Sequence, residues 1–144
     1  MALFDQLGVS HVIHCGDVGG SAVFEELAGR PCTFVWGNTD EPDQSLLIFL
    51  RTVGLRPPER VPTTIELGGK TFAIFHGHER GFEAAIDCLE VDYVLHGHTH
   101  EPRDEFNNGK RIVNPGALHR ARRPTVATVD TVSDQVILYD LTHT

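Results

Sequence analysis

Basic residues are scarce in this chain of 144 amino acids. It holds 12 lysines and arginines against 20 aspartates and glutamates, which gives a formal net charge of −8. Because proteins that bind nucleic acids meet the phosphate backbone with clustered positive charge, this balance argues against a DNA or RNA partner. The sequence also lacks an apolar run long enough to cross a membrane. We expect no signal peptide, since no basic segment follows Met1, and we expect a cytoplasmic protein.

Cysteine is the second residue in short supply. Cys15, Cys32 and Cys88 are odd in number and form no Cys-x-x-Cys pair, so the sequence predicts neither a disulfide framework nor a thiolate zinc site. Histidine, in contrast, is abundant. Five of the nine histidines lie in two short segments, 76–78 and 96–100. This grouping makes the chain a candidate metal protein.

The length and the hydrophobic content of 40% suit a single domain, spanning residues 1–144, with a substantial core. Helices are expected over residues 2–7, 21–27, 42–53 and 82–89, with Ser21 as a helix cap. Strands are expected over residues 11–15, 32–36, 63–67, 70–75, 93–95, 104–106, 111–113, 126–130 and 135–139. Helices alternate with strands early and hairpins dominate later. The pattern predicts a mixed α/β sandwich of two facing sheets with helices outside.

Four of the expected strands end in loops that carry metal-ligand side chains. These loops are Gly16-Asp17, Gly37-Asn38-Thr39-Asp40, His76-Gly77-His78 and Gly97-His98-Thr99-His100. Strand ends of this kind converge on one rim of an α/β sheet. Carboxylate, amide and imidazole groups suit Mn²⁺, Fe²⁺ or Zn²⁺, and two such ions can clamp a phosphate and activate a water. The first two loops alone are ordinary turns, and Gly97-His98-Thr99-His100 is the most specific of the four, but it is all four together that predict a metal centre.

The order of these four loops, followed by Asn114-Pro115-Gly116, resembles the calcineurin-like metallophosphoesterases. The resemblance runs from Asp5 to Leu141 and is strongest to the small bacterial and archaeal phosphodiesterase branch, to which the retromer subunit scaffold is also related. It implies the αββα sandwich of that family. It also implies a metal-dependent phosphoesterase, first of all a phosphodiesterase, that acts on a small-molecule phosphoester.

The same resemblance implies roles for individual residues. Asp17, Asn38, His76 and His98 correspond to the catalytic set around one ion, with Asp17 bridging to a second ion that His100 also binds. Asn38 would also contact the substrate. Manganese is the first candidate metal, with nickel, zinc, iron and magnesium as alternatives.

The sequence departs from the family pattern at its start. The family opens with a strand that ends in Asp-x-His, and no such motif precedes Asp17. We therefore expect the first interior strand to be missing and Met1 to be internal to a longer gene product. One ion site keeps four candidate ligands, whereas the second keeps only Asp17 and His100. We therefore expect one strong site, impaired activity, and dimerisation or strand exchange through the free strand edges.

Two further features leave alternatives open. Thr39 stands where many family members have a histidine, so this loop supplies no general acid. Arg120, Arg122 and Arg123 follow the Asn-Pro-Gly turn, and Arg122 is a candidate substrate ligand because arginine matches phosphate geometry. A solvated basic loop is the more common explanation of such a cluster. His14 is expected beside the site and His11 in a structural role.

Two other functions remain open from sequence alone. The first is a non-catalytic interaction scaffold on the same fold, which exposed apolar patches would favour. The second is a structural site for a single ion, which predicts loss of folding on chelation and no turnover.

Overall fold

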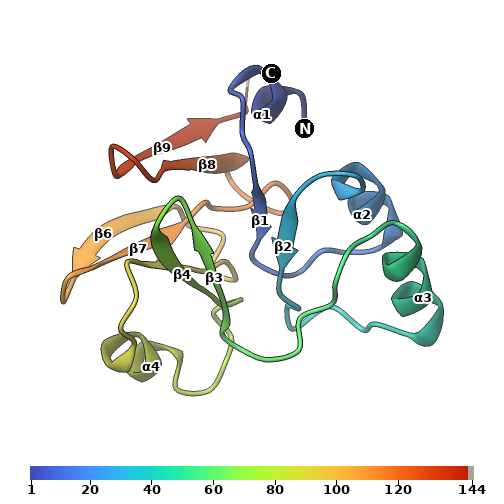
Figure 1. The fold of residues 1–144 in the computed structure, drawn as a ribbon, viewed down its shortest axis with the longest axis horizontal. Coiled ribbons are helices and arrows are strands. Elements are labelled where there is room, and N and C mark those ends of the chain that lie inside the picture. The colour runs from blue at the N-terminus through green and yellow to red at the C-terminus, as the bar shows by residue number, and fades with distance from the viewer. Residues whose placement is uncertain (143–144) are drawn as a thin grey trace.

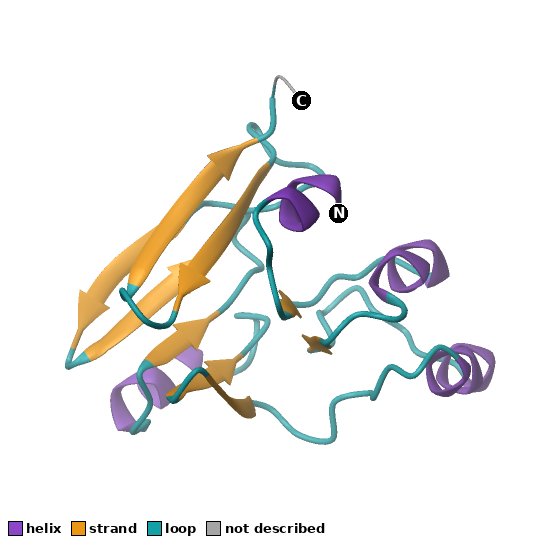
Figure 2. Ribbon diagram, turned by 45° about the horizontal axis from the view of Figure 1, so that its top comes forward, coloured by secondary structure: helices purple, strands orange, loops and turns teal. Residues whose placement is uncertain are grey.

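The computed structural model describes residues 1–142, which form layers of strands with helices on the outside (Figures 1 and 2). The helices are α1 (Ala2–Gln6), α2 (Ser21–Leu27), α3 (Gln44–Thr52) and α4 (Phe82–Cys88). The strands are β1 (Val12–His14), β2 (Cys32–Phe34), β3 (Thr63–Leu67), β4 (Lys70–Ile74), β5 (Tyr93–Leu95), β6 (Arg103–Asn107), β7 (Lys110–Asn114), β8 (Thr125–Asp130) and β9 (Gln135–Asp140). Every element expected from the sequence is present, with ends displaced by one or two residues.

The largest sheet contains five strands in the order β3-β4-β5-β7-β6. Its centre is parallel, because β5 pairs in parallel with both β4 and β7, while β3 and β6 pair antiparallel at the two edges. β1 and β2 form a separate parallel pair, and β8 and β9 form an antiparallel pair. Parallel neighbours end at the same edge of a sheet, so the loops after β1 and β2, and those after β4 and β5, emerge in pairs.

Helices cover the outer faces of these sheets. The apolar sides of α2 and α3 bury Phe24 and Leu50 against β1 and β2. On the opposite side of the molecule, α4 buries Phe82 and Ile86 against the five-stranded sheet. In Figure 2 the helices α2 and α3 lie to the right of the strands and α4 lies to the lower left. The expected sequence of layers, helix–sheet–sheet–helix, is confirmed.

A third apolar cluster lies between the two strand layers. Phe72 of β4 and Tyr93 of β5 stack with ring centroids 4.7 Å apart at its centre. Ile13 of β1 and Val129 of β8 pack on this cluster from the other layer. Burial of these side chains from both layers joins the sheets and fixes the position of the loops at their ends.

The N-terminal ends of α2 and α3 are capped in different ways. The expected cap at Ser21 is wrong, because Gly20 occupies that position without a side-chain hydrogen bond and Ser21 is already helical. Gly19 and Gly20 both have positive φ, a conformation that glycine adopts at little cost, and the chain enters α2 through them. α3 has a side-chain cap instead, in which Leu46 N–H donates to the Asp43 carboxylate at 2.8 Å.

A groove separates β1 from β8. Among the described residues β1 pairs only with β2 and β8 only with β9, so one edge of each strand has no partner strand. The groove has a volume of about 610 Å³, and Ile13, Phe72, Val113 and Val129 contribute to its apolar lining.

The longest described helix, α3, has 9 residues. No helix within residues 1–142 combines the length and apolar character needed to traverse a lipid bilayer.

Candidate metal centre

His76 lies at the centre of the candidate site, and its surroundings fix its orientation. Its backbone N–H donates to Glu79 at 2.8 Å, and its carbonyl accepts from Gly97 N–H at 2.8 Å. Its ring Nδ1 lies 2.7 Å from the Cys15 carbonyl. Because a carbonyl can only accept, Nδ1 carries the proton, and in the neutral ring Nε2 then has a free lone pair. The side chain is 2% exposed, so Nε2 is the one polar group of His76 left for the site.

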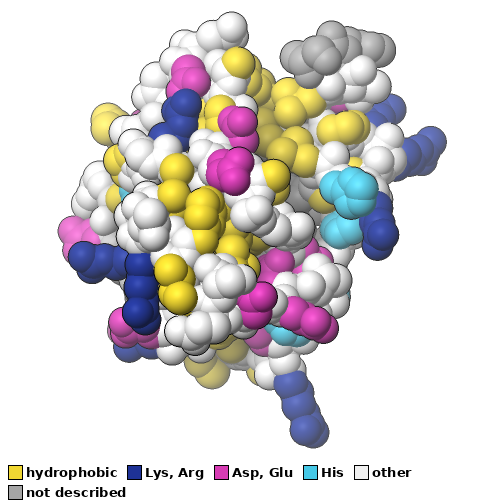
Figure 3. All heavy atoms as spheres, turned by 90° about the vertical axis from the view of Figure 1, so that its right-hand side faces the viewer, with side chains coloured by type: hydrophobic (Ala, Val, Ile, Leu, Met, Phe, Trp, Pro, Cys, Tyr) yellow, Lys and Arg dark blue, Asp and Glu magenta, His cyan; other side chains and the backbone are white. Residues whose placement is uncertain are grey.

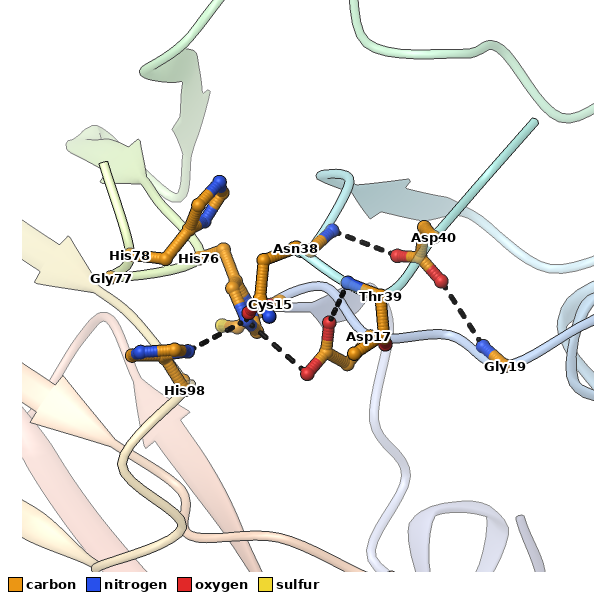
Figure 4. A network of polar contacts seen from close by, with 12 residues as sticks. Cys15, Asp17, Gly19, Asn38, Thr39, Asp40, His76, Gly77, His78 and His98 are labelled. Carbon is orange, nitrogen blue, oxygen red and sulfur yellow. Dashed lines mark hydrogen bonds and ion pairs between the residues drawn. The ribbon is translucent and has the colours of Figure 1, made fainter. Parts of the chain in front are cut away.

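Three other electron-rich groups surround this nitrogen (Figure 4). His76 Nε2 lies 3.1 Å from Asn38 Oδ1, 3.4 Å from Asp17 Oδ2 and 3.3 Å from His98 Nδ1. One of these contacts, that with His98, can be a hydrogen bond to the lone pair. The amide and carboxylate oxygens cannot donate, so they face Nε2 as acceptors. A cation among these atoms would remove the repulsion between their lone pairs. Such a cluster of electron-pair donors is what a metal site requires.

The spacing of these atoms also suits a small divalent ion. With ligands about 2.1 Å from the ion, neighbouring ligands lie about 3.0 Å apart in an octahedron and about 3.4 Å apart in a tetrahedron. The three contacts of His76 Nε2 fall close to this range. No group of three or more His, Cys, Asp or Glu side chains within residues 1–142, this cluster included, is arranged to hold an ion by itself. The set therefore depends on the Asn38 amide, and all three spacings are measured from His76.

Asp17 is ionised at neutral pH. Burial alone raises the pKa of this carboxyl group, but the hydrogen bond from Thr39 N–H, 3.0 Å from Oδ1, and the nearby imidazoles of His76 and His98 outweigh that effect. The net pKa lies below its ordinary value. A charged carboxylate is the form that binds a metal ion.

The backbone at the site is unusual. Six non-glycine residues of the described chain have positive φ, and three of them, Asp17, His98 and His100, are candidate ligands. Left-handed backbone at such residues is costly and concentrates at functional sites. Gly16 explains part of the close packing, because a Cβ there would lie 2.6 Å from His76 Nδ1.

Not every predicted residue joins the cluster. The structure brings Asp17, Asn38, His76 and His98 together, as the sequence predicted. Within residues 1–142 no hydrogen bond or ion pair connects His100 or Arg122 to these four, and Arg122 is exposed. The roles predicted for them stay predictions.

The remaining histidines near the site have the surroundings expected of them. His14 Nδ1 is buried without a hydrogen-bond partner in the described chain. Burial lowers the pKa of His14, while Asp40 and Asp17 nearby act in the opposite direction. His11, just before β1, has its Nε2 2.9 Å from the Thr33 hydroxyl of β2, a contact between neighbouring strands.

Supporting contacts hold the ligand loops, and sequence reasoning missed most of them. Asp40 accepts from Gly19 N–H at 3.2 Å and from Gly37 N–H at 2.8 Å, which joins the loops of Asp17 and Asn38. Asn114 is fully buried, and its amide donates to the Gly97 carbonyl at 2.9 Å, beside His98. The spacing of Gly-Asn-x-Asp contained a signal for Asp40, since such carboxylates often accept from nearby backbone N–H groups in turns.

Comparison with known proteins agrees with this geometry. Residues 1–134 match the calcineurin-like phosphoesterase superfamily domain. The chain belongs to this superfamily. As a calcineurin-like phosphoesterase it is a member of a group that generally uses divalent metal ions.

A characterised relative of this calcineurin-like phosphoesterase is the phosphodiesterase MJ0936 of Methanocaldococcus jannaschii. The two are 29% identical over 134 residues, which cover 90% of this chain and 81% of the relative. A solved archaeal phosphodiesterase has a TM-score of 0.85 at 28% identity and covers 97% of this chain and 88% of its own. These matches confirm the resemblance to the small phosphodiesterase branch.

More distant structures share the fold of this calcineurin-like phosphoesterase. Vps29 from Entamoeba histolytica has a TM-score of 0.68 at 22% identity, over 99% of this chain and 83% of its own. The phosphoesterase YfcE from E. coli has a TM-score of 0.65 at 20% identity, over 98% of this chain and 89% of its own. The archaeal phosphodiesterase is the more similar in both sequence and structure.

Proposed function

We propose that this protein is a metal-dependent phosphodiesterase, acting as a single domain, whose ion is held by Asp17, Asn38, His76 and His98. The observation that carries the proposal is the convergence of an amide oxygen, a carboxylate oxygen and an imidazole nitrogen on the lone pair of His76 Nε2. Membership of the phosphoesterase superfamily and the similarity to archaeal phosphodiesterases support the reaction class.

The protein side chains have distinct tasks in this reaction. When bound, divalent ions activate a water for in-line attack on phosphorus and offset charge on the phosphate oxygens. Asp17 contributes the negative charge of the site, and Thr39 N–H holds its Oδ1 so that Oδ2 faces His76. The Cys15 carbonyl keeps the proton of His76 on Nδ1. Hydrolysis forms a bond from the water oxygen to phosphorus and breaks one phosphoester bond.

The second ion site is the weaker one. Only Asp17 and His100 are candidates for it, and within residues 1–142 no hydrogen bond or ion pair holds His100 beside the first four residues. Turnover is therefore weak in this chain, with about one ion bound tightly where a full binuclear site binds two.

A second copy of the chain, pairing with the free edges of β1 and β8, forms a dimer.

The same proposal extends to the metal that is bound, the cell compartment and the residues that contact the substrate. Manganese is the first candidate, and nickel, zinc, iron and magnesium follow, since the mixed oxygen and imidazole ligands suit any of them. A reducing cytoplasm is supported by three free cysteines. Arg122 contacts the substrate phosphate together with Asn38. The face that carries α2 and α3 mixes acidic, basic and apolar side chains, which supports a small phosphoester substrate over nucleic acid (Figure 3).

Metal content and turnover of bis(p-nitrophenyl) phosphate test the proposal together. Wild type, Asp17→Asn and His98→Gln would be dialysed, analysed for metal, and assayed with each of the five metals. His119→Gln is the matched control, because His119 is exposed and has no role in the proposed site. We expect both site variants to lose about 100-fold or more in kcat/KM and the control to match wild type.

Two results would contradict this expectation. If wild type turns over no phosphodiester with any of the metals, the catalytic proposal fails. If turnover is present but unchanged in Asp17→Asn and His98→Gln, the site has been assigned to the wrong residues. The alternative of a non-catalytic scaffold has less support, because the Vps29 structure is more distant than the archaeal phosphodiesterase.

A further inference from the structure

The carboxylate of Glu79 lies directly behind the His76 loop and makes an unusual pair of contacts. Its Oε1 accepts from His76 N–H at 2.8 Å, and its Oε2 accepts from Gly77 N–H at 2.7 Å. The side chain is 18% exposed. Both oxygens are therefore engaged by consecutive backbone amides, and hydrogen bonds from N–H groups to a charged acceptor are among the stronger kinds.

These contacts act on the one residue whose orientation matters most to the cluster. The His76 carbonyl and Nδ1 are already held by Gly97 N–H and by the Cys15 carbonyl. Glu79 supplies the third restraint, on the His76 N–H. Without it the His76 N–H has no acceptor, and the residue loses one of the three restraints that set the position of Nε2.

The position of Gly77 explains why the His76 and Gly77 N–H groups need an acceptor from a side chain. Its φ is +108°, and an added Cβ would lie 3.3 Å from the Gly97 carbonyl and 3.4 Å from the Cβ of His98. The loop after β4 is thus pressed against the loop that carries His98, where it forms no strand pairing. Two consecutive N–H groups are left without strand partners, and buried N–H groups without acceptors are costly.

We propose that Glu79 is a positioning residue for the metal centre: by accepting from both His76 N–H and Gly77 N–H, it sets the loop that aims His76 Nε2 at the ion. The inference rests on the proposed function, because it assumes that the cluster binds a metal. Glu79 itself does not contact the ion in this role, since its two oxygens face the backbone. Groups that support a metal ligand in this way typically contribute 10- to 100-fold to metal affinity, as an order-of-magnitude guide.

Titration of the metal-free protein with Co²⁺, followed by its d–d absorption, tests the role without an activity assay. We expect Glu79→Ala to weaken Co²⁺ binding by about 10- to 100-fold and to change the shape of the absorption band. Glu79→Gln keeps one oxygen acceptor but opposes the second N–H with its amide, so its affinity should fall between those of wild type and Glu79→Ala. Glu83→Ala is the matched control, because Glu83 is a nearby carboxylate that is 76% exposed.

Thermal unfolding of each metal-free variant separates positioning from a general effect on stability. If Glu79→Ala unfolds at a lower temperature but binds Co²⁺ like wild type, Glu79 is only structural and the inference is overturned. If Glu79→Ala does not fold, Glu79→Gln decides: weaker Co²⁺ binding supports the role, and unchanged binding overturns it. If wild type itself binds no Co²⁺, the proposed function fails and this role fails with it, which is a different result from failure of the Glu79 variants alone.

Discussion

Gly37 is where the loops of Asp17 and Asn38 come closest together. A Cβ at this position would overlap the backbone nitrogen and carboxylate of Asp17 and would lie 2.7 Å from Asp17 Cγ. Backbone atoms cannot move aside as a flexible side chain can. The absence of a side chain at Gly37 is therefore a requirement of the site and not only of the turn.

Gly37→Ala should destabilise the protein and weaken metal binding together. Overpacking of this kind costs about 1–3 kcal/mol in free energy of unfolding. Gly109→Ala is the control, because Gly109 has a φ of +79° and open space around it, so it measures only the cost of left-handed backbone, about 1 kcal/mol. Chemical denaturation and Co²⁺ titration measure both effects. Unchanged Co²⁺ affinity in Gly37→Ala would show that the two loops move independently.

At this scale the sequence predicted which residue types form the site but not how they are held. The order of Asp17, Asn38, His76 and His98 after four strands was enough to bring them together. It could not show which nitrogen of His76 faces the cluster, because that depends on the Cys15 carbonyl, 61 positions away. The part played by Glu79 was also hidden, since a carboxylate three residues from a ligand is common on any surface.

The turn between β8 and β9 joins one strand pair to the five-stranded sheet. Asp134 in this turn accepts from the Tyr93 hydroxyl at 2.7 Å and from Lys70 Nζ at 2.9 Å. Arg111 donates to the Asp134 carbonyl from β7. These contacts lie on β4, β5 and β7, so a single turn touches the three central strands of the other layer.

The stability contributed by Asp134 should depend on pH. Hydrogen bonds from the Tyr93 hydroxyl and then Lys70 lower the pKa of Asp134 below its value of 3.8 in an unfolded chain. A lowered pKa means that the contribution is fully present above this value and is lost as the pH falls through the folded-state pKa. Asp134→Asn should therefore be less stable than wild type at pH 7, and the difference should shrink as the pH falls below 3.8. Urea midpoints measured from pH 7 into the acid range test this, and a difference that stays constant over the whole range would contradict it.

Helices and strands could be predicted from the sequence where the residue pattern that defines them lies within a short segment. Hairpins, helices and the loops after strands follow from short segments, and their ends shift by only one or two residues. Sheet order was not predictable in this way. β7 lies beside β5 in parallel, while its chain neighbour β6 lies at the edge. This arrangement depends on packing against α4 and against the apolar cluster between the two strand layers. The capping of α2 by Gly20 depended on a backbone conformation that the residue order did not specify.

The free edges of β1 and β8 give the whole molecule a surface suited to strand pairing. Unpaired N–H and C=O groups along such edges are templates for another chain. The groove between them has both apolar lining and exposed rim residues such as Ser10. This arrangement underlies the proposed dimer.

Ser10→Lys should weaken self-association, because it places a charge at the rim of the groove where a second chain would pair. Gln44→Lys adds the same charge at an exposed position on α3, away from the groove, and should associate like wild type. Sedimentation velocity over a range of concentrations measures the monomer–dimer equilibrium. A wild-type chain that stays monomeric at every concentration would rule out the dimer.

The hydrogen bond from His76 Nδ1–H to the Cys15 carbonyl crosses from the end of β4 to the end of β1, and so from one sheet to the other. It is 2.7 Å long, so a sliding of the sheets by about 1 Å exceeds the distance range in which such a bond holds. The geometry of the site therefore depends on how the two sheets are aligned. Replacing Phe72, in the apolar cluster between the two strand layers, should therefore alter metal affinity without touching any proposed ligand. Selection for the proposed metal binding would then also constrain the packing of the two sheets.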